Sequence, residues 1–167
     1  MSYLQESSQY YLLGLIIACV FLICAVIFES LRQPFAILML IPFPFIGVFP
    51  TFWLFGINFD QGGYASFVLL IGLAVNAGIF IINDYNNLKR AFPAVNAYTL
   101  YLKAFNHKMV TIVLTIFSTV IGLVPFVLGG QRELFWFAFA TGTMGGLLFL
   151  FVGVYLFLPV FLLMGKE

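Results

Sequence analysis

The sequence predicts an all-α membrane protein, a five-helix transmembrane bundle with its N-terminus outside and its C-terminus inside. Of its 167 residues, 63% are hydrophobic and 8% are charged, whereas a soluble domain carries ~25% charged residues. Five stretches without Asp, Glu, Lys or Arg are each about long enough to cross a hydrocarbon core ~30 Å thick. Helices are expected because a spanning segment satisfies its own backbone hydrogen bonds. The stretches, which form a single domain over residues 1–167, are Tyr11–Phe28, Pro34–Phe55, Tyr64–Ile82, Met109–Gly129 and Phe135–Met164.

The first span contains both cysteines of the chain, Cys19 and Cys24. A thiol in an apolar environment behaves as a small hydrophobic group, so we expect neither a disulfide nor a metal pair here. The ten residues before the span include Glu6 but no Lys or Arg. A cleaved signal peptide has a basic first region, so none is expected.

Prolines and asparagines distinguish the next two spans. Pro42, Pro44 and Pro50 remove backbone donors from the second span, which predicts a bent or irregular helix. In the third span Asn76 and Asn83 lie seven residues apart and share one helix face. A polar side chain inside a span is a candidate for function.

A long connection, Asn83–Lys108, joins the third and fourth spans and is interrupted by Pro93. From about 94 to 107 its apolar residues recur at helical spacing, with Lys103 and Lys108 on other faces. This pattern predicts an amphipathic helix on the cytoplasmic membrane surface; an ordinary helix packed under the bundle fits it equally, and both can hold. The apolar residues are Ala97, Leu100, Tyr101, Ala104 and Phe105.

The fourth span begins with a polar stripe. Steps of three or four residues place its members on one helix face. Such a stripe is a candidate for ion handling, and the structural alternative is interhelical hydrogen bonding. Its members are Lys108, Thr111, Thr115, Ser118 and Gly122.

The last span carries Ala138, Gly142 and Gly146 at four-residue spacing. Small residues at this spacing allow two helices to approach closely in lipid. We therefore predict that they lie at a helix–helix contact.

Basic residues set the predicted orientation, because cytoplasmic loops hold an excess of Lys and Arg. With five spans, alternate connections lie on the same side of the membrane. One side has Arg132 alone, so the other side is assigned to the cytoplasm. The cytoplasmic set is Arg32, Lys89, Arg90, Lys103, Lys108 and Lys166.

Several functions are disfavoured by composition. A net charge of +1 argues against a nucleic-acid partner, and His107 is the single histidine, which argues against zinc. We find no nucleophile–base pair and expect neither enzyme chemistry nor a cofactor. Glu29 and Asp84 lie at the inner ends of spans, so this chain has no carboxylate at mid-membrane to carry protons by itself.

Five motifs in order resemble the C-terminal membrane part of the resistance–nodulation–division (RND) efflux permeases, helices eight to twelve. Met1-Ser2-Tyr3 is similar to the segment that leaves the second periplasmic region. The motifs are Phe28-Glu29-Ser30 with Pro34-Phe35; Ile71-Gly72-Leu73-Ala74-Val75-Asn76-Ala77-Gly78-Ile79; Gly122-Leu123-Val124-Pro125; Thr141-Gly142-Thr143-Met144-Gly145-Gly146; and Leu158-Pro159-Val160-Phe161.

The resemblance implies part of a trimeric exporter of the bacterial inner membrane, driven by proton influx and of the kind that confers multidrug resistance. In that family an aspartate pair on the fourth helix titrates, and basic and polar residues of the tenth and eleventh helices respond. The tenth-helix Lys position holds Asn76, the eleventh-helix basic position falls on Lys108, and the Thr two turns later falls on Thr115. Thr111 replaces a Pro often found between them.

The implied partners are the lipid bilayer, the remaining helices of the permease and its periplasmic porter domains. This sequence contains neither those helices nor those domains. A fragment, a truncated relative and one part of a split transporter all fit. The competing interpretation is a structural membrane subunit that packs against partner helices and transports nothing.

Overall fold

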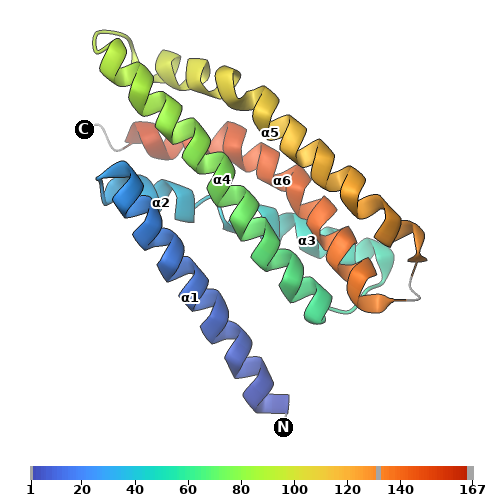
Figure 1. Cartoon of the computed structure of the whole chain (residues 1–167). Coiled ribbons are helices and arrows are strands. Elements are labelled where there is room, and N and C mark those ends of the chain that lie inside the picture. Colours follow the sequence, from blue (N-terminus) through green and yellow to red (C-terminus); the bar gives the residue numbers. More distant parts are fainter. Residues whose placement is uncertain (1, 131–132, 165–167) are drawn as a thin grey trace.

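The computed structural model describes residues 2–130 and 133–164, with side chains from 11 to 160, and within those ranges it contains six α-helices and no strand (Figure 1). Five segments are long and apolar enough to cross a membrane, because α2 and α3 together make one of them. The predicted all-α class and five spans are confirmed. Arg132 and Lys166, used for the orientation, lie outside the described residues. The helices are α1 Ser2–Phe28, α2 Arg32–Leu38, α3 Pro42–Phe55, α4 Gln61–Ala91, α5 Ala97–Leu128 and α6 Leu134–Met164.

The second span is divided into α2 and α3 at Pro42. Proline has no N–H and its ring clashes with the carbonyl four residues earlier. The chain passes the break through tight turns, in which Leu40 donates to the Ile37 carbonyl (3.0 Å) and Ile41 to the Leu38 carbonyl (3.2 Å). Pro50 lies inside α3 without ending it.

The centre of the bundle is formed by α3, α4 and α6, which pack through small residues. Gly47 of α3 and Gly145 of α6 face each other so closely that a Cβ on Gly145 would lie 2.8 Å from the Gly47 carbonyl oxygen. About half of the spanning segment of α4 and of α6 is buried, against 6% for α1. Figure 1 shows α1 diverging from the other helices toward its N-terminus.

Three helices extend well beyond their predicted spans, and one of them is α1, which begins at Ser2 instead of Tyr11. The charge-free stretch 64–82 became α4, Gln61–Ala91, and the predicted stretches 94–107 and 109–129 became one helix, α5. Polar residues end a membrane span but do not end a helix, and neither Pro nor Gly occurs between Asn83 and Ala91 or between Ala97 and Ile121. The helices instead begin at caps, with Asp60 accepting from the Gly62 and Gly63 N–H groups and Asn96 from that of Tyr98.

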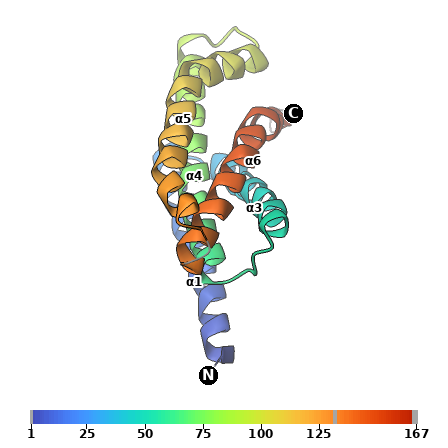
Figure 2. The same ribbon diagram turned by 90° about the vertical axis from the view of Figure 1, so that its right-hand side faces the viewer.

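The first turns of α5 lie across the end of the bundle before the helix turns along α4 (Figure 2). Their apolar face is turned into the protein, where Leu100, Tyr101, Ala104 and Phe105 are buried. The Tyr101 hydroxyl donates to the Val154 carbonyl of α6 at 2.7 Å. The apolar face of this segment is therefore packed against the bundle, and its position on the membrane surface stays a prediction.

Candidate functional site

A small hollow lies where α4, α5 and α6 meet, and it brings together two of the residues singled out in the sequence. Asn76 of α4 and Thr115 of α5 both line it. Its volume is about 20 Å³, which is close to the space of one water molecule. Apart from Asn76 and Thr115 its lining is apolar: Leu73, Ala77, Phe80, Ile112, Ile116, Leu147 and Leu150.

The polar stripe of α5 faces outward beside this hollow. Thr111, Ser118 and Gly122 are exposed and Thr115 is half-buried. The hydroxyls bind their own helix: Thr115 donates to the Thr111 carbonyl at 2.9 Å and Ser118 to the Thr115 carbonyl at 3.0 Å. These hydrogen bonds are intrahelical, so the hydroxyls of Thr115 and Ser118 do not hold α5 to the neighbouring helices described here.

An acidic side chain lies near the Lys108 end of the same face. The Asp84 carboxylate of α4 is 3.1 Å from His107 Nδ1 and 3.9 Å from Lys108 Nζ, both on α5. The Asp84 side chain is 18% exposed and that of Lys108 is 37% exposed. The 3.9 Å distance and the partial exposure of the Lys108 side chain make this contact a loose one, of a class worth about 0–1 kcal/mol.

Sequence reasoning did not identify this cluster. Asp84 was placed at the end of a span and His107 was considered for zinc alone. The available signal was topological: a short connection makes α4 and α5 antiparallel neighbours, so residues equally far from the turn meet. Asp84 lies nine residues before Pro93, and Lys108 lies fifteen residues after it. The two still meet, because the first turns of α5 cross the end of the bundle and add residues without adding length along α4.

A second polar pair that the sequence did not reveal lies nearby. The side-chain amides of Gln33 in α2 and Asn86 in α4 exchange two hydrogen bonds, of 2.9 and 2.8 Å. Asn83, which shares a face with Asn76, is exposed. The C-terminal part of α4 is therefore bonded to α2 through Asn86 and to α5 through Asp84.

The residues considered for packing lie inside the bundle, on the face of α6 that contacts α3 and α4. Ala138 is fully buried, and its Cβ is 3.0 Å from where a Cβ on Gly62 would lie. A Cβ on Gly142 would lie 2.8 Å from both Phe52 Cε2 and Ser66 Oγ. One on Gly146 would lie 3.0 Å from the Pro44 carbonyl oxygen and closer still to Leu70.

Comparison with known proteins gives one family. The family profile described as the AcrB/AcrD/AcrF family matches residues 2–165. The chain is 26% identical over 164 residues to the toluene efflux pump membrane transporter TtgB and to the multidrug/solvent efflux pump membrane transporter MepB, both of Pseudomonas putida. The match covers 95% of this chain and 15% of each relative. The swarming motility protein SwrC of Bacillus subtilis is 26% identical over 113 residues, 68% of this chain and 11% of that protein.

Proposed function

Because this chain belongs to the AcrB/AcrD/AcrF family, we propose that it is the C-terminal transmembrane bundle of a proton-coupled RND efflux permease. It would contribute to proton-driven export when joined to the remaining helices and periplasmic domains. The chain spans about 15% of the length of the curated relatives it matches. Export, proton coupling, a trimeric assembly and the inner-membrane location therefore all belong to this proposal.

The observation that carries the proposal is the convergence of Asn76 and Thr115 on one hollow. They come from helices that the resemblance assigns to proton coupling, and they lie on a polar face that this chain leaves open. A carboxylate on a helix docked against that face at the level of the hollow would meet the Asn76 amide and the Thr115 hydroxyl. Lys108 lies seven residues from Thr115, about 10 Å along the helix, and its long side chain could extend toward that carboxylate.

Lys108 supplies the charge that such a carboxylate would respond to. A nearby cation lowers the pKa of a carboxylate, and protonation of the carboxylate weakens its hold on the cation. Within this chain Lys108 is 3.9 Å from Asp84 and partly exposed, so its ammonium is held loosely and could turn toward another carboxylate. Asp84 also has His107 Nδ1 at 3.1 Å, which could remain its partner.

The test is export by the complete permease carrying Lys108→Ala, at matched expression. We expect export to be lost while the protein remains folded, and Lys108→Arg to retain it because the cation is kept. Full export by Lys108→Ala would leave Lys108 as an interfacial anchor that reaches the headgroups and would remove the main support for coupling through α5.

The orientation is proposed from the same asymmetry of basic residues: N-terminus and the 130–134 connection outside, 83–108 inside. Single cysteines at Gln131 and at Lys89 test it by labelling from the outer face of intact cells. We expect label at Gln131 alone. Label at Lys89 alone would show that the orientation is reversed.

The alternative candidate is a structural subunit without transport. Two observations favour it: α6 packs through glycines, and none of the predicted spans carries an Asp or Glu at its middle. Under either proposal, vesicles containing this chain alone should show no proton uptake. Uptake would identify a self-sufficient carrier and contradict both.

A further inference from the structure

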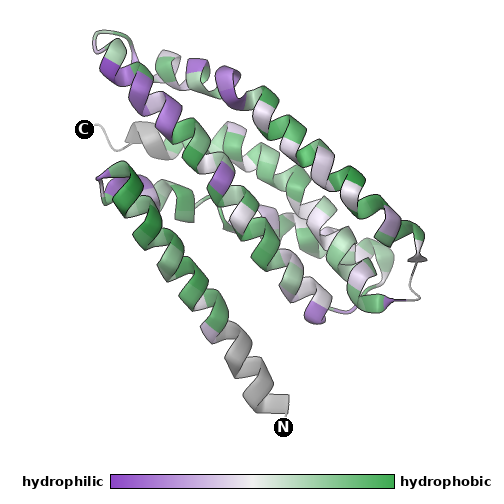
Figure 3. Ribbon diagram, viewed as in Figure 1, coloured by the Kyte–Doolittle hydropathy of each residue, from purple (hydrophilic) through white to green (hydrophobic). Residues whose placement is uncertain are grey.

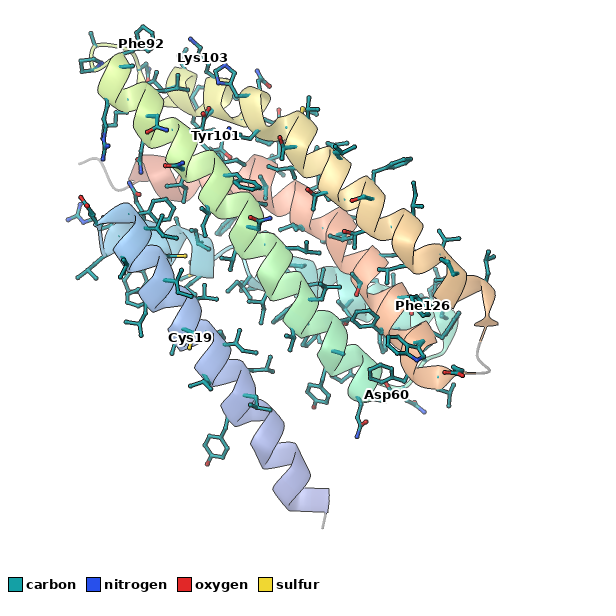
Figure 4. The ribbon with its side chains drawn as sticks, in the orientation of Figure 1. Cys19, Asp60, Phe92, Tyr101, Lys103 and Phe126 are labelled. Atoms are coloured by element: carbon teal, nitrogen blue, oxygen red, sulfur yellow. The ribbon has the colours of Figure 1, made fainter. Side chains whose placement is uncertain are left out.

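A cluster of exposed cations and aromatic rings occupies the end of the α4–α5 hairpin. We call it the basic cap: Lys89, Arg90, Phe92, Tyr98 and Lys103. Each of the five is exposed, Phe92 at 47% and Tyr98 at 53%. The Lys103 ammonium lies 5.1 Å from the centre of the Phe92 ring, which joins the first turns of α5 to the end of α4 (Figure 4).

The cap exists because the first turns of α5 turn their apolar face inward. Leu100, Tyr101, Ala104 and Phe105 pack on the bundle, and the Tyr101 hydroxyl is bonded to α6. What remains outward is charged and aromatic. Figure 3 shows hydrophilic residues gathered at this end of α4 and α5, beside long hydrophobic stretches toward the other end.

Among the described residues, the ion pairs found near this end involve His107 and Lys108 and none of the three cations of the cap. The sequence contains no Asp or Glu between Asp84 and Glu133. Asp84 already has His107 and Lys108 within 4 Å. The N-terminal end of the α5 dipole, which carries partial positive charge, points toward the same turn.

We propose that the basic cap binds the headgroups of anionic phospholipids in the leaflet that borders it. Position selects this partner. The cap follows directly after the apolar part of α4, and Lys89 is only seven residues beyond Ile82, about 10 Å along a helix. Lysine and arginine side chains extend back toward the interface by several ångströms, which brings their charges to the level of the lipid phosphates.

The chemistry of the cap agrees with its position. Clusters of cations next to a membrane span attract anionic lipids, and exposed aromatic rings favour the interface between headgroups and water. The attachment differs from that of an amphipathic helix, which inserts an apolar face into lipid, because here the apolar face is already occupied by protein. The proposal does not depend on the transport function, nor on which leaflet is cytoplasmic.

The test compares lipids retained by the full chain in nanodiscs that contain phosphatidylglycerol and phosphatidylcholine in equal amounts, measured by native mass spectrometry. The variant is Lys89→Gln/Arg90→Gln/Lys103→Gln. The first control is Lys89→Arg/Arg90→Lys/Lys103→Arg, which keeps every charge. The second is Lys108→Gln, which removes one cation that is engaged with Asp84.

The native chain and the charge-preserving control should retain phosphatidylglycerol in preference to phosphatidylcholine. Each removed cation should weaken that preference by up to about fivefold, so the triple Gln variant should lose it, and Lys108→Gln should lose little. Inorganic phosphate should not compete, since a free anion lacks the membrane position.

An unchanged lipid preference in the triple Gln variant would overturn the proposal. A loss of thermal stability accompanying that result would show that Lys89 and Arg90 serve instead to offset the C-terminal dipole of α4.

Discussion

The buried face of α6 and the open face of α5 use similar residues for opposite purposes. Both helices carry small and hydroxyl-bearing residues at steps of three or four. On α6 these residues are buried against α3 and α4, at Gly142, Gly145 and Gly146. On α5 a Cβ added at Gly122 would meet no atom within 4 Å, and Thr111 and Ser118 are exposed.

Hydroxyl groups do not distinguish the two faces. Thr141 of α6 donates to the Phe137 carbonyl of its own helix at 2.7 Å, just as Thr115 of α5 donates to Thr111. The two faces differ in what covers them. The α6 face contacts backbone atoms of α3, whereas only 11% of the spanning segment of α5 is buried. A closed face serves stability, and an open polar face is available to a partner.

The largest effect is expected at the closest backbone approach, between α3 and α6. In Gly145→Leu the new Cβ would lie 2.6 Å from Thr51 Oγ1 and 2.8 Å from the Gly47 carbonyl oxygen. Neither atom is the end of a long flexible side chain, so the helices have to separate. Overpacking of this kind costs about 1–3 kcal/mol or more, and the melting temperature in detergent should fall.

Gly122→Leu is the matched control on α5. The site is open, and replacing a mid-helix glycine favours the helix by roughly 0.5–1 kcal/mol, so stability should be unchanged or slightly higher. Equal losses in the two variants would erase the distinction between the closed and open faces.

A smaller effect is expected where the crossing turns of α5 are held to α6. Tyr101 is 1% exposed and its hydroxyl is bonded to the Val154 carbonyl. Tyr101→Phe removes one buried hydrogen bond, which costs about 1 kcal/mol. Tyr98→Phe, on the exposed side of the same turns, should leave thermal stability unchanged. An equal loss of stability in Tyr98→Phe would show that the hydrogen bond from Tyr101 to Val154 does not stabilise the fold specifically.

Periodicity and composition predicted most of this fold because they report on single helices. Charge-free length located the five spans, and Pro42 marked the break between α2 and α3. The same criterion ended the third span at Ile82, although α4 continues to Ala91, because charge limits the lipid-facing part and does not limit the helix. Gly47 and Thr51 lie four residues apart in α3 and both face Gly145. This pair fits the small-residue pattern that identified Gly142 and Gly146, and it was missed because the pattern was considered in α6 alone.

The candidate site was less accessible to sequence reasoning because it depends on which helices become neighbours. Asn76 and Thr115 were singled out separately, and nothing in their spacing showed that they line one hollow. The contact of Asp84 with His107 and Lys108 follows from the bend at the start of α5, which no local signal in the sequence indicates.

The smallest change in stability is expected for Thr115→Val. This variant separates a role in helix packing from a role in proton coupling. Valine keeps the shape of threonine, and the hydroxyl that is lost bonds to the Thr111 carbonyl of its own helix, which leaves helix packing intact. Thermal stability should therefore stay within about 0.5 kcal/mol of the native value. In the complete permease, export should fall, though less than with Lys108→Ala, because a hydroxyl contributes about 1 kcal/mol against a larger charge effect.

Thr141→Val on α6 is the matched control, for it removes an equivalent intrahelical bond far from the open face and should leave export unchanged. If Thr141→Val reduced export as much as Thr115→Val, the loss would reflect a general disturbance of the helices. The open face of α5 would then have no specific role in proton coupling.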